Sequence, residues 1–211
     1  ATLDNVDLSM ADLTGAQLVS GTGDRSRTVR RIVDEHELWV REQGRGGTRA
    51  ELAKVDLSNV DLSDVNLAGA NLSGAILEGA IMRRTNLVMA DFAGANLRNA
   101  DLRDADLRGV NLNNVDLSGA MLNGATMSAV DIRDANGQAT GRLWSANLVG
   151  ANLRGADLSG AQLKDADMQG ADLSGARLQG TVLMGAKYQE AIIDLEQLAR
   201  AIINPGRRSK N

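Results

Sequence analysis

Few residues in the chain could carry out acid–base, nucleophilic or metal chemistry. His36 is the only histidine among 211 residues, and there is no cysteine. Asp34, Glu35 and Glu37 flank His36, but a zinc-binding His-Glu-x-x-His motif needs a second histidine. Serine and aspartate are plentiful, yet no other histidine exists to activate a serine. We therefore expect no catalytic residues, no metal and no cofactor, and we expect that the protein is not an enzyme.

Aspartate and asparagine recur at one position of a five-residue pattern. Every fifth residue is apolar, and usually leucine, over residues 3–18, 52–132 and 143–188, apart from a slip near 137. A small residue commonly stands two positions before the leucine, and aspartate or asparagine one position before. A period of five fits neither a helix nor a continuous strand, so each unit must be a short extended side followed by a corner. Aspartate and asparagine favour turns, and we interpret them as accepting backbone hydrogen bonds there.

These units resemble the pentapeptide-repeat family through the motif Ala-(Asp/Asn)-Leu-x-Gly, as in Ala-Asn-Leu at 151–153. The resemblance covers residues 1–19 and 50–190. It implies an all-β fold, a right-handed quadrilateral β-helix with four units per coil, in a bacterial protein. With aromatic residues at only 2%, the core must be narrow. Four units per coil predict two stacked columns: Leu52, Leu72, Phe92, Leu112 and Ile132, and Leu62, Met82, Leu102 and Leu122.

We expect a β-solenoid at residues 1–190, interrupted by a helical insertion at 20–49, and then a C-terminal helix and basic tail at 191–211. The insertion predicts a helix at about 27–43, because its apolar residues follow helical spacing. Its apolar stripe is expected to pack on the solenoid wall, with the histidine as a packed side chain; the residues of this stripe include Ile32, Val33, His36 and Trp39.

Two other places depart from the repeat. Between Ile132 and Leu143 the register slips by one residue, which we interpret as a bulge or short loop. After residue 190, Asp194 and Gln197 have the spacing of a helix capping box. This helix is expected to cap the last coil, because an open solenoid end exposes its core and its strand edges. The alternative is a homodimer contact, since related proteins dimerise through C-terminal elements.

Residues next to each leucine point outward, and some of them are apolar or basic. Ile81, Met121, Trp144 and Met184 are expected to share one face if the slip preserves the order of faces. Exposed apolar patches usually mark contacts, although the inserted helix could cover part of this one. Arg83 and Arg84 belong to a basic cluster with interleaved aspartates, which favours mixed ion pairs over a partner site. These six residues are the candidate partner contacts.

The sequence favours a non-enzymatic scaffold that presents a rigid β-solenoid wall to a protein partner of unknown identity. The resemblance suggests an alternative, because some pentapeptide-repeat proteins mimic duplex DNA, bind DNA gyrase and protect it from fluoroquinolones. That mechanism needs an acidic wall, whereas the net charge is only −4 and the two positions after each leucine hold more basic than acidic residues.

The same near-neutral charge gives no reason to expect direct nucleic-acid binding. No apolar run approaches the roughly 20 residues of a membrane span, and no secretion signal opens the chain. We therefore expect no membrane association and a cytoplasmic location. Ala1 is already in repeat register, which is compatible with a processed or trimmed N-terminus.

Overall fold

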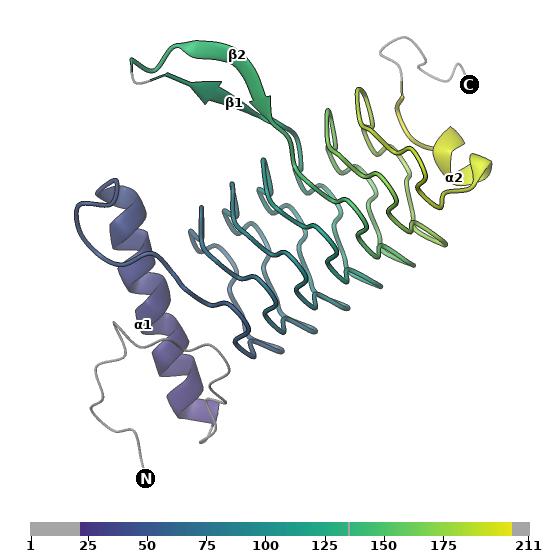
Figure 1. Ribbon diagram of the computed structural model, residues 1–211. Helices are drawn as coiled ribbons and strands as arrows, with labels where there is room; N and C mark the ends of the chain where they lie inside the picture. Colours follow the sequence, from purple (N-terminus) through teal and green to yellow (C-terminus); the bar gives the residue numbers. More distant parts are fainter. Residues whose placement is uncertain (1–21, 135, 204–211) are drawn as a thin grey trace.

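The computed structural model describes residues 22–134 and 136–203. A stack of similar coils lies between helix α1 (Thr22–Arg41) and helix α2 (Leu195–Ala199), and a hairpin of strands β1 (Val130–Arg133) and β2 (Ala139–Trp144) projects from it (Figure 1). The predicted units at residues 1–19 and the basic tail at 204–211 lie outside the described residues. Within the described chain, no helix is long and apolar enough to cross a membrane.

Each described coil contains twenty residues, apart from the coil that carries the hairpin. Parallel bridges join Glu51 to Asn71 and Asn71 to Asp91, and the other sides of the coil pair at the same interval. The N–H of Leu52 donates to the carbonyl of Asn71 over 2.7 Å, and the N–H of Asn71 donates to the carbonyl of Ala50 over 2.9 Å. Because these short ladders repeat from coil to coil, the chain forms a β-helix with four five-residue units per coil.

The corners of the coil account for the turn residues of the repeat. The N–H of Ala75 donates to the carbonyl of Leu72 over 3.0 Å and closes a tight turn. Gly74, in this turn, has φ 64°, a conformation that glycine adopts without strain. The side chain of Asn71 accepts a hydrogen bond from the N–H of Ser73 over 3.2 Å, and aspartates do the same at other corners. The interpretation of these residues as turn acceptors is therefore confirmed.

Leucine and the small residue two positions earlier fill the interior. The predicted columns are buried to within 2% exposure at every described member except one; the buried members are Leu52, Leu72, Phe92, Leu112, Leu62, Met82, Leu102 and Leu122. The exception is Ile132, which lies half-buried in β1 and not in a coil. The N–H of Leu112 instead donates to the carbonyl of Asn147, so the next coil begins after the hairpin.

The slip between Ile132 and Leu143 is a hairpin, and the prediction of a bulge or short loop was wrong. Strands β1 and β2 are antiparallel, with Val130 paired to Trp144. The hairpin separates Asn111 from its bridge partner Asn147 by 36 residues, sixteen more than in the other coils. Leu143, expected in the core, is 52% exposed because β2 pairs with β1 and not with a coil.

Helix α1 covers the N-terminal end of the described stack (Figure 1). The prediction that it packs on the solenoid wall was therefore wrong. Its buried Val29 and Val33 belong to the same core cluster as the leucines of the coils. The N–H of Asn66 donates to the carboxylate of Glu37 over 3.3 Å. The first described coil has an open strand edge, and its N–H groups need acceptors, which α1 supplies.

Helix α2 takes the place of one side in the last coil. Ile192 bridges to Asp172 just before α2, and Ile202 bridges to Val182 just after it. The capping box is present, and the Gln197 side chain also donates to two backbone carbonyls, those of Leu173 (2.9 Å) and Ala176 (2.8 Å). These two hydrogen bonds hold α2 against the coil beneath it.

Candidate functional site

The one histidine is a structural residue in this fold. His36 is 0% exposed between α1 and the first described coil, and its ring stacks on Trp39 with centroids 5.4 Å apart. The N–H of Ala50 donates to its Nδ1 over 3.0 Å. Among the described residues, no three histidine, aspartate or glutamate side chains converge to hold a metal ion. Leucine and small residues fill the described interior, so the side chains that could contact a partner lie on the outer surface of the β-helix.

The predicted contact residues do not form one patch. Ile81 and Met121 lie in one column with Asp101 between them, since both bridge to Asp101. Met184 lies on a neighbouring side, where the adjacent Val182 bridges to Gln162. Trp144 lies in β2, outside the coils. The prediction that these four apolar residues share one face was wrong, because the hairpin leaves the coil. The succession of the four sides of the coil therefore does not continue through the hairpin.

Asp101 is the centre of a charged network on the side that carries Ile81 and Met121. It is 4% exposed, and Arg83 and Arg103 both form ion pairs with it. Hydrogen bonds from Arg103, and next from Arg83, outweigh the effect of burial and lower the pKa of Asp101 to about 2. Arg84 forms a bidentate pair with Asp64, with both distances 2.7 Å. Both predicted contact arginines therefore have acidic partners within the chain.

The same pairing recurs along the wall. Aspartates that precede a leucine are matched by arginines, for the most part in the neighbouring coil; these pairs are Asp116–Arg98, Asp106–Arg108, Asp172–Arg154 and Asp157–Arg177. Exposed pairs of this kind add little stability. Their consequence is electrostatic, since they neutralise much of the negative charge that the repeat places on the surface.

The largest exposed aromatic group lies where the hairpin leaves the coils. Trp144 is 52% exposed, Met89 is 48% exposed, and both approach Gly109 together with Val130. A Cβ atom on Gly109 would lie 3.1 Å from Trp144 Cδ1, 3.1 Å from Val130 Cγ2 and 3.4 Å from Met89 Cγ. We call Met89, Val130 and Trp144 the Trp144 patch. Met89 was not predicted to join Trp144, because only the fold of the hairpin brings them together.

Replacing Gly109 by alanine is expected to destabilise the protein more than the same change at Gly94. Both glycines have a similar positive φ, 63° and 65°, so both variants carry the same backbone strain, about 1 kcal/mol. Of these two glycines, only Gly109 has side chains close to the position of the new Cβ atom. Crowding against them adds about 1–3 kcal/mol to the loss of stability. Urea denaturation of both variants measures the difference. Equal losses would mean that the hairpin does not pack on Gly109.

Comparison with known proteins identifies the repeat. The family model for pentapeptide repeats matches residues 48–84, 61–99, 100–136 and 143–187, in 8 copies. A search of curated proteins found no match.

Solved structures of pentapeptide repeat proteins resemble the chain. HetL, involved in heterocyst differentiation regulation in the cyanobacterium Nostoc sp. strain PCC 7120, is 29% identical, with 76% of this chain and 85% of HetL covered and a TM-score of 0.38. A protein from the Arabidopsis thaliana thylakoid lumen is 27% identical, with 56% and 67% covered and a TM-score of 0.37. QnrB1, a plasmid-mediated fluoroquinolone resistance protein, is 20% identical, with 72% and 89% covered and a TM-score of 0.46.

Proposed function

The chain belongs to the pentapeptide-repeat family, and we propose that it is a non-enzymatic scaffold whose rigid β-helix presents the Trp144 patch to a partner protein. The twenty-residue coil fits the family's right-handed quadrilateral β-helix, with four units per turn. A buried lone histidine and a wall of paired charges support a binding role over a catalytic one.

The observation that carries this proposal is the half-exposed tryptophan at the base of a projecting hairpin. Monomeric proteins rarely leave large apolar side chains together on the surface unless they bind something, and tryptophan is enriched among residues that dominate binding energy. The hairpin adds sixteen residues that the coil does not need, because the ladders continue on both sides of it. Ile81 and Met121 form a smaller apolar pair, interrupted by the ion pairs of Asp101.

Excision of the hairpin separates binding from folding. Deleting residues 130–145 places Met127 and Leu148 five positions apart, and a further Ala129→Gly change restores the usual turn residue. We expect this variant to keep the far-ultraviolet circular dichroism of the coils and to lose the partners captured by the wild type from a lysate of the source cells. Trp144→Asp is expected to reduce their capture at least tenfold, the loss of about 1.4 kcal/mol or more that truncating a central aromatic contact commonly causes.

Met121→Asp is the matched control, because Met121 is also exposed and apolar but lies on the coil wall. We expect it to capture the same partners as the wild type. If the excised variant still captures them, the contact lies on the coil wall and the proposal fails.

The gyrase-binding alternative rests on the family resemblance and on what QnrB1 is named for. The described wall gives it little support, because most aspartates of the repeat pair with arginine or lysine. A supercoiling assay with purified gyrase, with and without ciprofloxacin, decides the matter. If the protein at micromolar concentration neither inhibits gyrase nor protects it from ciprofloxacin, the gyrase-binding alternative is wrong.

A homodimer would use the C-terminal end. Apolar residues there are exposed, among them Ile192 at 58% and Leu195 at 84%. Light scattering of the wild type and of Leu195→Asp tests this contact. A wild type that scatters as a monomer at high concentration rules it out.

A further inference from the structure

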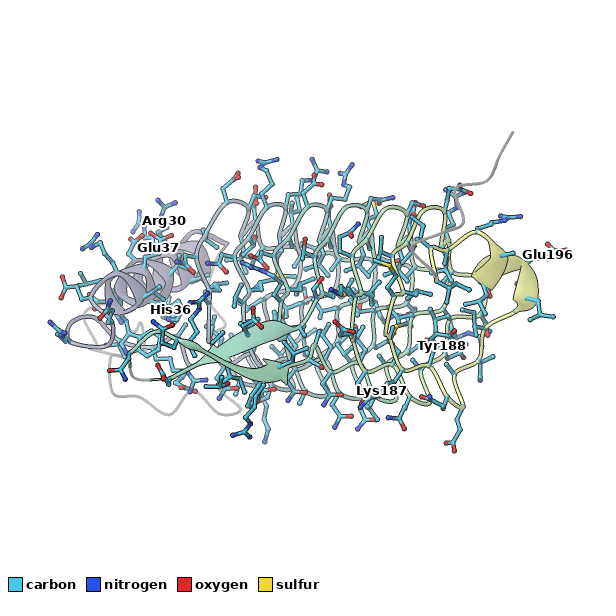
Figure 2. All side chains as sticks on the ribbon, turned by 90° about the horizontal axis from the view of Figure 1, so that it is seen from above. Arg30, His36, Glu37, Lys187, Tyr188 and Glu196 are labelled. Atoms are coloured by element: carbon cyan, nitrogen blue, oxygen red, sulfur yellow. The ribbon has the colours of Figure 1, made fainter. Side chains whose placement is uncertain are left out.

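His36 holds α1 on the β-helix through a bond that depends on its protonation state. Its Nδ1 accepts the N–H of Ala50, which lies at the open edge of the first described coil. A nitrogen can accept a hydrogen bond only when it carries no proton, so this imidazole must be neutral with its proton on Nε2. Both His36 and Glu37 lie on α1 (Figure 2), and their hydrogen bonds to Ala50 and Asn66 place them on its side toward the coils.

Protonation would turn this bond into a repulsive contact. A proton on Nδ1 would point at the N–H of Ala50, and the two donors are 3.0 Å apart. Ala50 is buried, so its N–H would be left without a partner, and the imidazolium would be a buried charge. Nε2 has no hydrogen-bond partner among the described residues. The backbone of Ala68 favours the protonated ring, but burial opposes protonation more strongly, and the pKa of His36 is lowered.

The charged neighbours of His36 come from both sides of the contact. Glu37 on α1 favours the protonated ring, and Arg49 from the coil side disfavours it. Glu37 also accepts the N–H of Asn66, which holds its carboxylate toward the coil. Burial is the largest influence and, with Arg49, lowers the pKa of His36 below its ordinary 6.5.

We propose that α1 is an acid-released cap, and that protonation of His36 frees it and uncovers the N-terminal end of the β-helix. The remaining contacts of α1 with the coils include the buried Val29 and Val33 and the hydrogen bonds of Glu35 and Glu37. When α1 leaves, the N–H groups of Ala50 and Asn66 lose their acceptors. Among the described residues, the edge of the first coil is then open, and an open strand edge is the kind of surface to which another strand can pair.

The direction of the effect follows from proton linkage. Released α1 leaves His36 with its ordinary pKa of 6.5, whereas the docked ring binds a proton more weakly. The capped state is therefore unaffected by pH well above 6.5 and is progressively lost as the pH falls below it. Tenfold is the most by which this linkage can raise the release equilibrium between roughly pH 7.5 and 5.5, since that factor requires a docked ring that stays neutral throughout.

Hydrogen exchange of the full chain measures this release. We expect the protection of α1 amides, corrected for intrinsic exchange rates, to fall as the pH is lowered over that interval, by up to about tenfold. The amides of residues 91–110, deep in the stack, are expected to keep their protection. His36→Asn is the matched control, because its Oδ1 stands where Nδ1 stood and accepts from Ala50 without titrating. Its α1 protection is expected to be independent of pH.

Three outcomes would overturn the proposal. The first is an equal pH dependence in the wild type and in His36→Asn. The second is simultaneous loss of protection in α1 and in residues 91–110, which would mean global unfolding. The third needs no variant: His36 is the only histidine, so its NMR titration can be followed directly in the wild type. A pKa at or above 6.5 would show that docking does not oppose protonation.

Discussion

Replacing Leu122 by aspartate is expected to unfold the coils around it, whereas aspartate at the adjacent Met121 should change stability by less than about 0.5 kcal/mol. Leu122 is 0% exposed and Met121 is 37% exposed. A carboxyl group at Leu122 loses about 1.5–3 kcal/mol of apolar burial. Burial in the core raises the pKa of this carboxyl group by about 3–5 units, and holding it protonated at neutral pH, about 3 units above its ordinary pKa, costs about 4 kcal/mol.

Together these costs approach the whole stability of a typical domain, about 5–15 kcal/mol. Each coil contacts only its neighbours, so losing the coil of Leu122 separates the stack into two parts. Circular dichroism during urea denaturation and limited proteolysis of both variants measure the difference. Similar urea midpoints for the two variants would contradict the inward and outward orientation of these side chains.

Replacing Phe92 by alanine is expected to lower the free energy of unfolding by about 3–5 kcal/mol. Phe92 is 0% exposed and lies in a column between Leu72 and Leu112. The narrow interior offers few side chains that could move into the space, so the cavity would stay open.

Phe92→Leu is the control for this prediction, because it gives the column its usual residue. We expect it to cost less than about 1.5 kcal/mol, since leucine fills most of the volume. Denaturant midpoints of the two variants provide the test. A loss for Phe92→Leu as large as that for Phe92→Ala would mean that the ring itself, and not its volume, is required.

Much of the core was predictable from the sequence because the five-residue spacing is a local signal. A leucine in phase with its neighbours lies in a column wherever the ladders continue. Ile132 is the exception, because it is in phase with Met127 in the sequence but lies in β1 and not in a coil. In β1, Val130 and Ile132 are the half-buried residues, so alternation along a strand requires an apolar residue at the same position. A side of a coil and strand β1 therefore both place an apolar residue at position 132, and the sequence pattern does not distinguish them.

The surface was less predictable, because its contacts join distant parts of the chain. Arg84 and Asp64 are 20 residues apart, one coil length, so this pair follows once the coil is known. Trp144 and Met89 meet only because the hairpin folds over Gly109, and no periodicity encodes that. The apolar stripe of α1 indicated a buried face, but a stripe does not specify whether it packs on a wall or on an end.

The corner after Met127 has a consequence for inheritance. The coils continue in register on both sides of the hairpin, so natural selection can lengthen, shorten or exchange such an insert without changing the repeats. Under the proposed function, partner choice can then diverge at the corners while the repeats stay the same.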